Sequence, residues 1–277
     1  MQKANFIVGT MRWGDLSVGQ AAQLLVGAVD AGVTTFDLAD IYGGYTIEKL
    51  FGQALKASGV ARDAVHIISK CAIVLPQNGQ GKRYDTSREY IRASVTRSLE
   101  QIGTDYLDTL LIHRPSPLMD LHEIAAAFDE LHASGQVRSF GVSNFDVYGF
   151  EQLNALYPLA AHQVELSLTQ PNALFDNTLL QLRLLGKSAQ IWSPLGTYFT
   201  ADAQPIRPIL LDLCDKYQAT ESQLLIAWAR HRQPNAAIVL GSTNIERLRI
   251  MIEAVKIEMD DADWFALLEA ARGFEVV

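Results

Sequence analysis

Asp37 and Tyr42 are the first pair of residues whose types and spacing suggest a reactive site. Residues 33–36 are β-branched or aromatic, which predicts a buried strand, and Asp37 follows where the apolar run stops. Tyr42 comes one short loop later, before Gly43 and Gly44, which let the backbone turn. A carboxylate at the end of a strand and a phenol in the following loop can meet at one site. The simpler alternative is a solvated Asp and a loop Tyr.

Lys70 and His113 each close another short apolar run, and they add an amine and an imidazole to the carboxylate and the phenol. These four groups suit proton delivery to a carbonyl oxygen. A free tyrosine has a pKa of about 10, too high for efficient acid–base catalysis near neutrality. We expect Lys70 to lower the pKa of Tyr42, Asp37 to keep Lys70 charged, and His113 to orient the substrate oxygen.

The sequence shows no nucleophile–base pair of the Ser-His kind and no metal-ligand spacing, which suggests that a cofactor carries the difficult step. Residues 240–244 form an apolar end, a Gly/Ser turn and a predicted helix start, with Arg247 in the first helical turn. Helix N-termini bind phosphate through their free N–H groups and the helix dipole. The alternative is an N-cap Asn244 and a surface Arg247 without a ligand.

Short apolar runs bounded by Gly or polar residues alternate with helical patterns along the whole chain. The expected strands lie at 6–8, 33–36, 65–70, 107–113, 137–142, 163–166, 190–193 and 236–240. The expected helices lie at 17–32, 47–57, 86–103, 120–134, 150–156, 177–185, 209–217, 221–232, 244–255 and 261–271.

Eight such strand–helix units predict a single-domain α/β protein, a (β/α)8 barrel over residues 1–277. A doubly wound sheet is less favoured, because no Gly-x-Gly-x-x-Gly follows the first strand. Active sites of such barrels lie at the C-terminal ends of the strands. Asp37, Lys70 and His113 should therefore converge at one mouth.

Composition excludes several other classes. Of the 277 residues 49% are apolar, so a large core is expected, and the net charge of −8 disfavours binding to nucleic acid. The two cysteines, Cys71 and Cys214, have no zinc spacing and fit a reducing compartment. With no span of the roughly 20 apolar residues a membrane helix needs, we expect a soluble, cytoplasmic protein without membrane or metal partners. The oligomeric state is left open, with a monomer favoured.

Taken together, the motifs resemble those of the aldo-keto reductase family over essentially the whole chain. The segments that carry the resemblance are Gly9-Thr10-Met11, Phe36-Asp37-Leu38-Ala39-Asp40-Ile41-Tyr42-Gly43, Ile68-Ser69-Lys70, Leu110-Leu111-Ile112-His113, Gly141-Val142-Ser143-Asn144-Phe145, Gln163-Val164-Glu165, Trp192-Ser193-Pro194-Leu195-Gly196 and Gly241-Ser242-Thr243-Asn244.

The resemblance implies a TIM barrel that reduces aldehydes and ketones to alcohols with NADPH as cofactor. Asp37, Tyr42, Lys70 and His113 fall on the family's catalytic tetrad, with hydride from the nicotinamide C4 and the proton from Tyr42. The implied cofactor-binding residues lie in the loops after several strands: Gly9, Thr10, Met11, Ser143, Asn144, Gln163, Trp192, Ser193, Leu195, Gly241, Ser242, Thr243, Asn244 and Arg247.

Within that set, the resemblance assigns separate parts of the cofactor to separate residues. Ser143, Asn144 and Gln163 match residues that hold the nicotinamide carboxamide. Trp192 takes the place of an aromatic residue that stacks on the nicotinamide ring, and Arg247 matches the Arg that pairs with the 2′-phosphate of NADP.

The chain departs from the family pattern in ways that affect the cofactor and the pocket. Gly241 stands where many members have Lys, and Ile250-Met251 stands where many have Glu-Asn against the adenine. The sequence ends at Val277 soon after the last predicted helix. We therefore expect no long C-terminal loop over the pocket, and an open pocket that accepts many small aldehydes.

Trp13, Tyr45 and Arg114 are the candidate pocket walls, with rim or core positions as the alternative. Two other functions stay open. One is an NADP-binding interaction module without enzymatic activity, which a turnover assay with generic aldehydes would reveal. The other is an aldolase with a Schiff base on Lys70, which borohydride trapping would reveal. The aldolase alternative gives no role to residues 143–144, 163 and 241–247.

Overall fold

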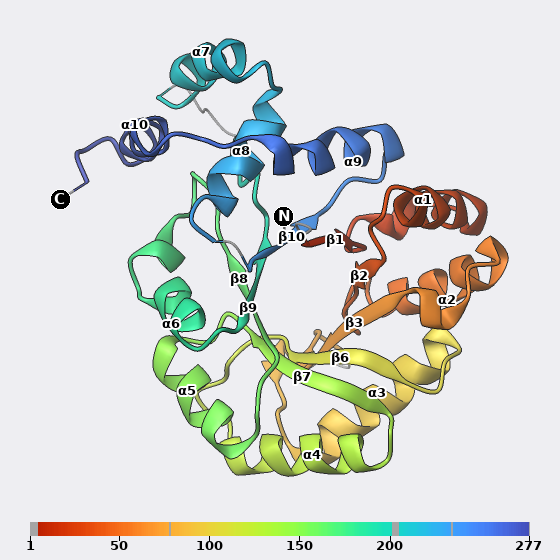
Figure 1. The fold of residues 1–277 in the computed structure, drawn as a ribbon. Coiled ribbons are helices and arrows are strands. Elements are labelled where there is room, and N and C mark those ends of the chain that lie inside the picture. Colours follow the sequence, from red (N-terminus) through yellow and green to blue (C-terminus); the bar gives the residue numbers. More distant parts are fainter. Residues whose placement is uncertain (1–4, 78, 201–204, 234, 277) are drawn as a thin grey trace. The chain divides into compact units, whose positions relative to one another are not determined.

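The computed structural model describes residues 5–77, 79–200, 205–233 and 235–276. Its main sheet has the hydrogen-bonded order of a closed barrel, β1-β10-β9-β8-β7-β6-β3-β2, which confirms the predicted (β/α)8 fold (Figure 1). The barrel strands are β1 (Asn5–Gly9), β2 (Thr35–Asp37), β3 (His66–Cys71), β6 (Leu107–Ile112), β7 (Val137–Ser143), β8 (Ala161–Glu165), β9 (Ser188–Trp192) and β10 (Ala237–Leu240).

Helices alternate with these strands as the sequence predicts. They are α1 (Val18–Asp30), α2 (Ile47–Ser58), α3 (Arg88–Ile102), α4 (Leu121–Ala133), α5 (Val147–Leu156), α6 (Thr178–Leu184), α7 (Arg207–Tyr217), α8 (Glu221–Arg230), α9 (Ile245–Ile252) and α10 (Asp261–Arg272). The expected helix at 244–255 is shorter, because a 3-10 turn, Glu253–Lys256, follows α9. None of the described helices is long and apolar enough to cross a membrane.

Local signals explain most of the helix boundaries. Ser17 and Gln20 form a capping box that starts α1. Gly59 and Gly103 end α2 and α3 in the left-handed conformation, at φ 72° and 73°, which glycine adopts without steric cost. These caps are visible in the sequence, so the predicted helix limits lie within a few residues of the observed ones.

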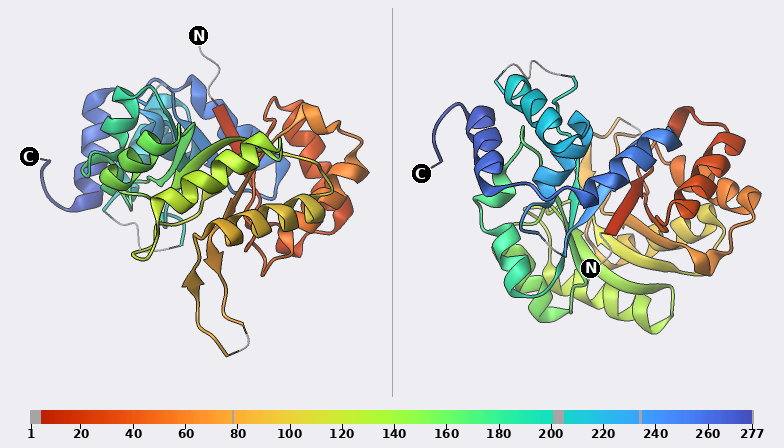
Figure 2. Two further views of the ribbon diagram at one scale, coloured as in Figure 1. Left: turned by 90° about the horizontal axis from the view of Figure 1, so that it is seen from below. Right: turned by 45° about the horizontal axis from the view of Figure 1, so that its top comes forward.

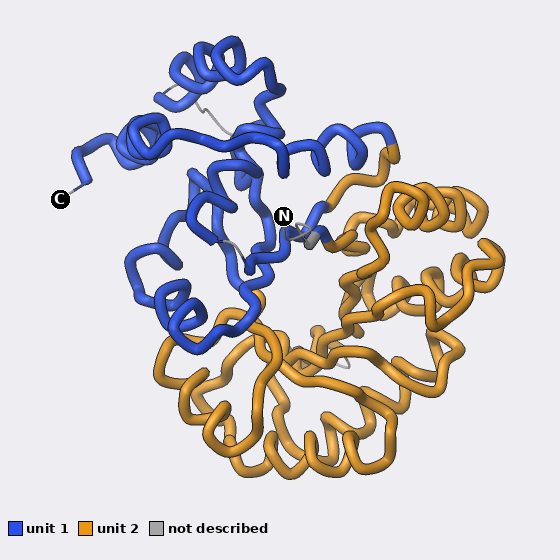
Figure 3. Tube along the Cα trace, in the orientation of Figure 1, with its two compact units in different colours: residues 1–6, 164–240, 246–277 blue, residues 7–163, 241–245 orange. Residues whose placement is uncertain are grey.

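The chain divides into two compact units (Figure 3). Unit 1 comprises residues 1–6, 164–240 and 246–277, and unit 2 comprises 7–163 and 241–245. The prediction of one domain over residues 1–277 stays a prediction, and residues 1–4 and 277 lie outside the described part of the chain.

Unit 2 carries the tetrad residues, and strand register places them. In the parallel β2–β3 pair Asp37 aligns with Ile68, and Lys70 follows two residues later on the same face of β3. In the β3–β6 pair Lys70 aligns with Leu111, and His113 follows the end of β6. Figure 1 shows β2, β3, β6 and β7 side by side in this order. The predicted convergence of strand ends is therefore present within this unit.

A two-stranded hairpin lies between β3 and α3, in a segment where the sequence analysis predicts neither a strand nor a helix. Strands β4 (Ile73–Val74) and β5 (Arg83–Tyr84) pair antiparallel, and the hairpin projects away from the rest of unit 2 (Figure 2). Strands of two residues are too short to leave a periodic pattern. The base of the hairpin is fixed, because the Leu75 N–H donates to the Tyr45 hydroxyl at 3.0 Å.

The packing of unit 1 includes a stacked pair of indoles. The Trp228 and Trp264 rings lie 5.2 Å apart with planes 6° from parallel. Each indole N–H donates to the backbone carbonyl of the other residue at 3.1 Å. This reciprocal arrangement joins α8 to α10 and satisfies both polar atoms.

Candidate active site

Lys70 is the centre of the candidate site. Its ammonium group donates to Asp37 Oδ2 at 2.7 Å, to the Leu38 carbonyl at 2.8 Å and to the Tyr42 hydroxyl at 3.0 Å. An ammonium has three N–H donors, so these bonds use all of them. Lys70 is 1% exposed and Asp37 is 3% exposed. A buried charge of each sign is therefore held as a pair, as the sequence predicts for this amine and carboxylate.

The Tyr42 hydroxyl accepts a hydrogen bond from Lys70, so its own proton is available to another acceptor. We expected Lys70 to lower the pKa of Tyr42. Lys70 does act in that direction, but burial outweighs it and raises the pKa above 10.0. Tyr42 is therefore a protonated phenol at neutral pH in this structure. The sequence could not give this balance, because burial depends on the whole fold.

His113 stands beside Tyr42, with the two rings in an edge-to-face arrangement 5.9 Å apart. Burial, Lys70, Arg114 and Lys82 lower the pKa of His113 to about 2. The imidazole is consequently neutral over the physiological range. Its Nδ1 is buried and has no hydrogen-bond partner among the described residues. A neutral imidazole can donate one N–H to a substrate oxygen without adding charge.

Three of the residues matched to the nicotinamide carboxamide lie next to the tetrad in unit 2. Gln163 donates its amide N–H to Asp37 Oδ1 at 2.8 Å. Asn144 donates to the Ser143 hydroxyl at 2.6 Å, and its backbone N–H donates to the Gln163 carbonyl at 2.9 Å. Asn144 has a φ of 57°, which Asn tolerates better than most residues. These side chains form one connected polar group with the tetrad.

Residues at and just after the end of β1 contact the backbone of Asp37. Thr10 is fully buried, and both its backbone N–H and its hydroxyl donate to the Asp37 carbonyl at 3.0 Å. Gly9 aligns with Asp37 across the β1–β2 pair. Met11 is 58% exposed. Thr10 thus fixes the backbone that carries the tetrad carboxylate, a contact that spacing alone did not reveal.

The predicted phosphate segment forms the turn before α9. The Asn244 N–H donates to the Ser242 hydroxyl at 3.1 Å, which is a local turn closed by a side chain. Gly241 and Thr243 are exposed, and a Cβ at Gly241 would meet no atom within 4 Å. At Gly27 of α1, in contrast, a Cβ would lie 2.6 Å from Cγ1 of Ile245, so a larger residue at this position would force the Ile245 side chain to shift.

The remaining cofactor candidates belong to unit 1. Trp192 is half-buried at the end of β9, and Ser193 follows it with a φ of 51°. Leu195 is half-buried, and Arg247 is exposed in the first turn of α9. Within unit 2, the structure brings the tetrad together with residues 9, 10, 143, 144 and 163. The roles of the unit 1 residues stay predictions.

The three candidate pocket walls have different surroundings. Trp13 is completely buried, with its ring 6.5 Å from Phe36 and 6.0 Å from Phe51, which favours the alternative interpretation as a core residue. Tyr45 is half-buried and accepts from the base of the hairpin. Arg114 is half-buried and acts electrostatically on both Tyr42 and His113.

A buried acidic cluster beside β3 escaped the sequence analysis. Asp40 is 5% exposed, and neither of its carboxylate oxygens has a hydrogen-bond partner within the described chain. Burial and the nearby Glu48 raise the pKa of Asp40 to about 7. Glu48 accepts from the Ser69 hydroxyl at 2.6 Å, and burial raises its pKa as well. No sequence signal marked this electrostatic pair, because the two residues are eight positions apart and belong to different local segments.

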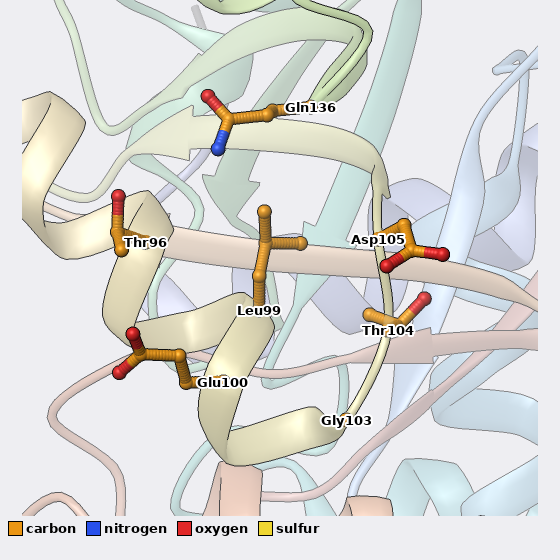
Figure 4. A pocket seen from close by; sticks show the side chains of 7 residues that line it. All are labelled: Thr96, Leu99, Glu100, Gly103, Thr104, Asp105 and Gln136. Atoms are coloured by element: carbon orange, nitrogen blue, oxygen red, sulfur yellow. The ribbon is translucent and has the colours of Figure 1, made fainter.

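A shallow groove lies away from the tetrad, at the end of α3 and in the loop before β6 (Figure 4). Its volume is about 410 Å³, and its lining residues are Thr96, Leu99, Glu100, Gly103, Thr104, Asp105 and Gln136. Gly103 to Asp105 precede β6 and Gln136 precedes β7, so the groove lies at the N-terminal ends of these strands. In barrels of this kind that face serves stability, and no tetrad residue lines the groove.

Comparisons with known proteins agree with this geometry. The sequence model described as Aldo/keto reductase family matches residues 5–272. "Oxidoreductase YdhF" of Escherichia coli is 40% identical over 99% of this chain and 95% of that protein. A "6-dehydroglucose reductase" of Agrobacterium fabrum is 36% identical over 100% of this chain and 97% of that protein. The solved structure of the thermostable aldo-keto reductase Tm1743 is similar with a TM-score of 0.82, at 27% identity over 95% of this chain and 94% of that one.

Proposed function

Because the chain belongs to the aldo/keto reductase family, and is therefore an oxidoreductase, we propose that it reduces aldehyde and ketone carbonyls to alcohols with NADPH. One observation carries the proposal. All three N–H donors of Lys70 are used, one of them on the Tyr42 hydroxyl, which leaves the phenol proton to be donated elsewhere. Tyr42 is then the general acid for the carbonyl oxygen.

Each tetrad residue has a separate role in proton transfer to the carbonyl oxygen. Tyr42 donates its proton as negative charge develops on the carbonyl oxygen, and the Lys70 ammonium at 3.0 Å stabilises the tyrosinate that results. Asp37 holds Lys70 in the charged state through the 2.7 Å ion pair. His113, which stays neutral, donates an N–H to the same carbonyl oxygen and orients it toward Tyr42.

The residues of this chain have the chemistry to hold NADPH, which supplies the hydride for the carbonyl carbon. Gln163 and Asn144 are amides with both donor and acceptor atoms, and with Ser143 they would hold the nicotinamide carboxamide next to Asp37. Trp192 would stack on the ring. The turn at 241–244 and the N-terminus of α9, together with Arg247, would bind the phosphates.

The residues matched to the family's adenine-binding positions, Ile250 and Met251, are apolar where many members have Glu and Asn. Ile250 is 45% exposed. Met251 is 6% exposed, so its side chain lies on the buried face of α9 and is not available to the adenine. Ile250 alone offers an exposed apolar surface there, which suits the face of a purine but adds no hydrogen bond. NADPH and NADH share the same adenine, so discrimination between them depends on the residues that would contact the 2′-phosphate.

The test is NADPH consumption against aldehydes, ketones, dicarbonyls and sugars. The panel includes 6-dehydroglucose, because two relatives carry the name of a reductase for that sugar. We expect turnover of many small aldehydes with weak KM. NADPH binding without turnover of any carbonyl would support the interaction module instead. Loss of activity after borohydride treatment with a carbonyl would support a Schiff base on Lys70.

A further inference from the structure

His162 is a completely buried polar side chain beside Gln163 in β8, and the proposed proton transfer does not use it. Successive side chains of a strand point to opposite faces. Gln163 points toward Asp37, to which it donates, so His162 points to the other face of β8. There its ring stacks on Phe150 of α5, with ring centres 5.1 Å apart and planes 14° from parallel. The imidazole is therefore fixed between the strand and the helix.

The imidazole accepts a backbone hydrogen bond. The Phe145 N–H donates to His162 Nε2 at 3.1 Å, and this bond is buried. A ring nitrogen that accepts a hydrogen bond carries no proton, so the ring is neutral and its proton is on Nδ1. The contact thus requires one tautomer of this histidine.

Two consecutive N–H groups attach the turn after β7 to β8. The Asn144 N–H donates to the Gln163 carbonyl at 2.9 Å, and the next N–H, that of Phe145, donates to His162. Pairing of the two strands ends where Ser143 aligns with Gln163, and Asn144 at φ 57° turns the chain away. Phe145 is 3% exposed, and a buried N–H without an acceptor is costly. The side chain of His162 supplies an acceptor beyond the end of the strand pairing.

This turn carries two of the side chains matched to the nicotinamide carboxamide. Asn144 donates its amide N–H to the Ser143 hydroxyl at 2.6 Å, so the position of one side chain depends on the other. On the far side of the turn, the Asp146 carboxylate accepts from the Gly149 N–H at 2.6 Å and caps α5. The bond to His162 lies between these two contacts and holds the middle of the turn.

We infer, on the premise of the proposed function, that His162 is a positioning residue for the cofactor. Its neutral imidazole holds the turn of Ser143 and Asn144 in the conformation that binds the nicotinamide carboxamide. Without the acceptor, the turn loses its order in the free protein, and cofactor binding must restore it. The effect is confined to the nicotinamide half, because the candidates for the phosphates lie elsewhere, at 241–247.

His162→Phe tests the inference, because a phenyl ring can still stack on Phe150 but has no acceptor. We would titrate NADP⁺ and 2′,5′-ADP by calorimetry, since the second ligand has the adenine and the 2′-phosphate but no nicotinamide. The dissociation constant of NADP⁺ should rise roughly 2- to 12-fold, the range for one neutral hydrogen bond. That of 2′,5′-ADP should stay at the wild-type value.

Two further variants separate the acceptor from the stability of the fold. In His162→Gln the side-chain oxygen can accept in place of Nε2, so most of the NADP⁺ affinity should return. His132→Phe makes the same substitution at an exposed histidine of α4, and both affinities should stay as in the wild type. A glutamine variant as weak as the phenylalanine variant would show that the acceptor is not the cause and would overturn the inference. An equal loss of affinity for both ligands in His162→Phe would do the same.

Nitrogen NMR on the wild-type protein tests the inference without a substitution, should His162→Phe fail to fold. We expect scalar coupling across the hydrogen bond between the Phe145 amide and His162 Nε2. NADP⁺ should slow hydrogen exchange of the Phe145 amide, and 2′,5′-ADP should not. Absence of the coupling, or equal slowing by the two ligands, contradicts the inference.

These measurements separate the inference from the proposed function. If NADP⁺ binds with the expected difference between wild type and His162→Phe but no carbonyl is reduced, only the proposed function fails. If carbonyls are reduced while His162→Phe binds NADP⁺ as tightly as the wild type, only the inference fails. A wild type that binds no NADP⁺ contradicts both.

Discussion

The amide of Gln163 donates to Asp37 Oδ1 at 2.8 Å, while Lys70 donates to the other oxygen of the same carboxylate at 2.7 Å. Gln163 lies in the middle of β8 and Asp37 at the end of β2, 126 residues apart in the chain. This contact joins a residue matched to the nicotinamide carboxamide to the ion pair of the tetrad. Under the proposed function, this contact would couple the position of the cofactor ring to that of the proton donor.

Gln163→Leu tests this coupling with a side chain of similar size that cannot hydrogen-bond. We expect a roughly tenfold weaker NADP⁺ affinity and a lower kcat, because one charge-assisted bond, about 1.5–3 kcal/mol, is lost at Asp37. The dissociation constant is measured by quenching of tryptophan fluorescence and kcat by NADPH consumption. A change in kcat at unaltered affinity would remove Gln163 from the cofactor site. The thermal midpoint checks that the variant is folded.

Tyr42→Phe should remove nearly all carbonyl reduction. The phenyl ring keeps its packing beside His113 and loses only the proton donor, and loss of a positioned general acid typically costs about 10²–10⁴-fold. Steady-state kinetics with a small aldehyde measure the effect, and cofactor titration serves as the control, since binding should be unchanged. Turnover at the wild-type rate would end the assignment of Tyr42.

Arg247→Ala should abolish most of the preference for NADPH over NADH. A guanidinium on the 2′-phosphate contributes about 1.5–3 kcal/mol, which gives roughly 10- to 150-fold discrimination. The lower part of this range is expected, because Gly241 supplies no second cation. The dissociation constants of NADPH and NADH are measured for the wild type and for Arg247→Ala by quenching of tryptophan fluorescence.

Arg249→Ala is the control for that experiment. Arg249 lies on the same helix and is paired with Glu246 at 2.8 Å, so its removal changes the charge of α9 by the same amount. The NADPH preference should stay as in the wild type. Equal wild-type affinities for the two cofactors would contradict the assignment of Arg247.

Asp40→Asn should stabilise the protein at alkaline pH. The folded state holds the Asp40 proton up to a pKa of about 7, whereas the unfolded carboxyl loses it near 3.8. Between these values the folded state binds more protons, so the free energy of unfolding falls as pH rises and reaches its lower limit above about 7. The difference corresponds to roughly 4 kcal/mol.

Urea unfolding near pH 5 and near pH 8 checks this pH dependence. The advantage of Asp40→Asn over the wild type should be larger at the higher pH, where the wild type must bury an ionised carboxylate beside Glu48. Asp15→Asn, at an exposed position, should change neither value. The same difference between Asp40→Asn and wild type at both pH values would show that Asp40 does not titrate in the folded protein.

The sequence determined the strand–helix order and the barrel class, and it pointed to the four side chains that the structure brings together, because these depend on local patterns. Apolar runs end at Asp37, Lys70 and His113, and parallel register places such ends at one edge of a sheet. Ser17 and Gly103 mark helix limits through caps that act within a few residues. Patterns that span only a few residues can be recognised from the sequence alone.

Only the tertiary structure decided the balance of forces at the site. Burial raises the pKa of Tyr42 although Lys70 opposes it, and the degree of burial is a property of all the elements around the residue. The electrostatic effect of Glu48 on Asp40 and the burial of Trp13 in an aromatic cluster likewise depend on residues from different elements. Long-range contacts of this kind leave no periodic signal, so the sequence named the reactive groups and the fold set their protonation states.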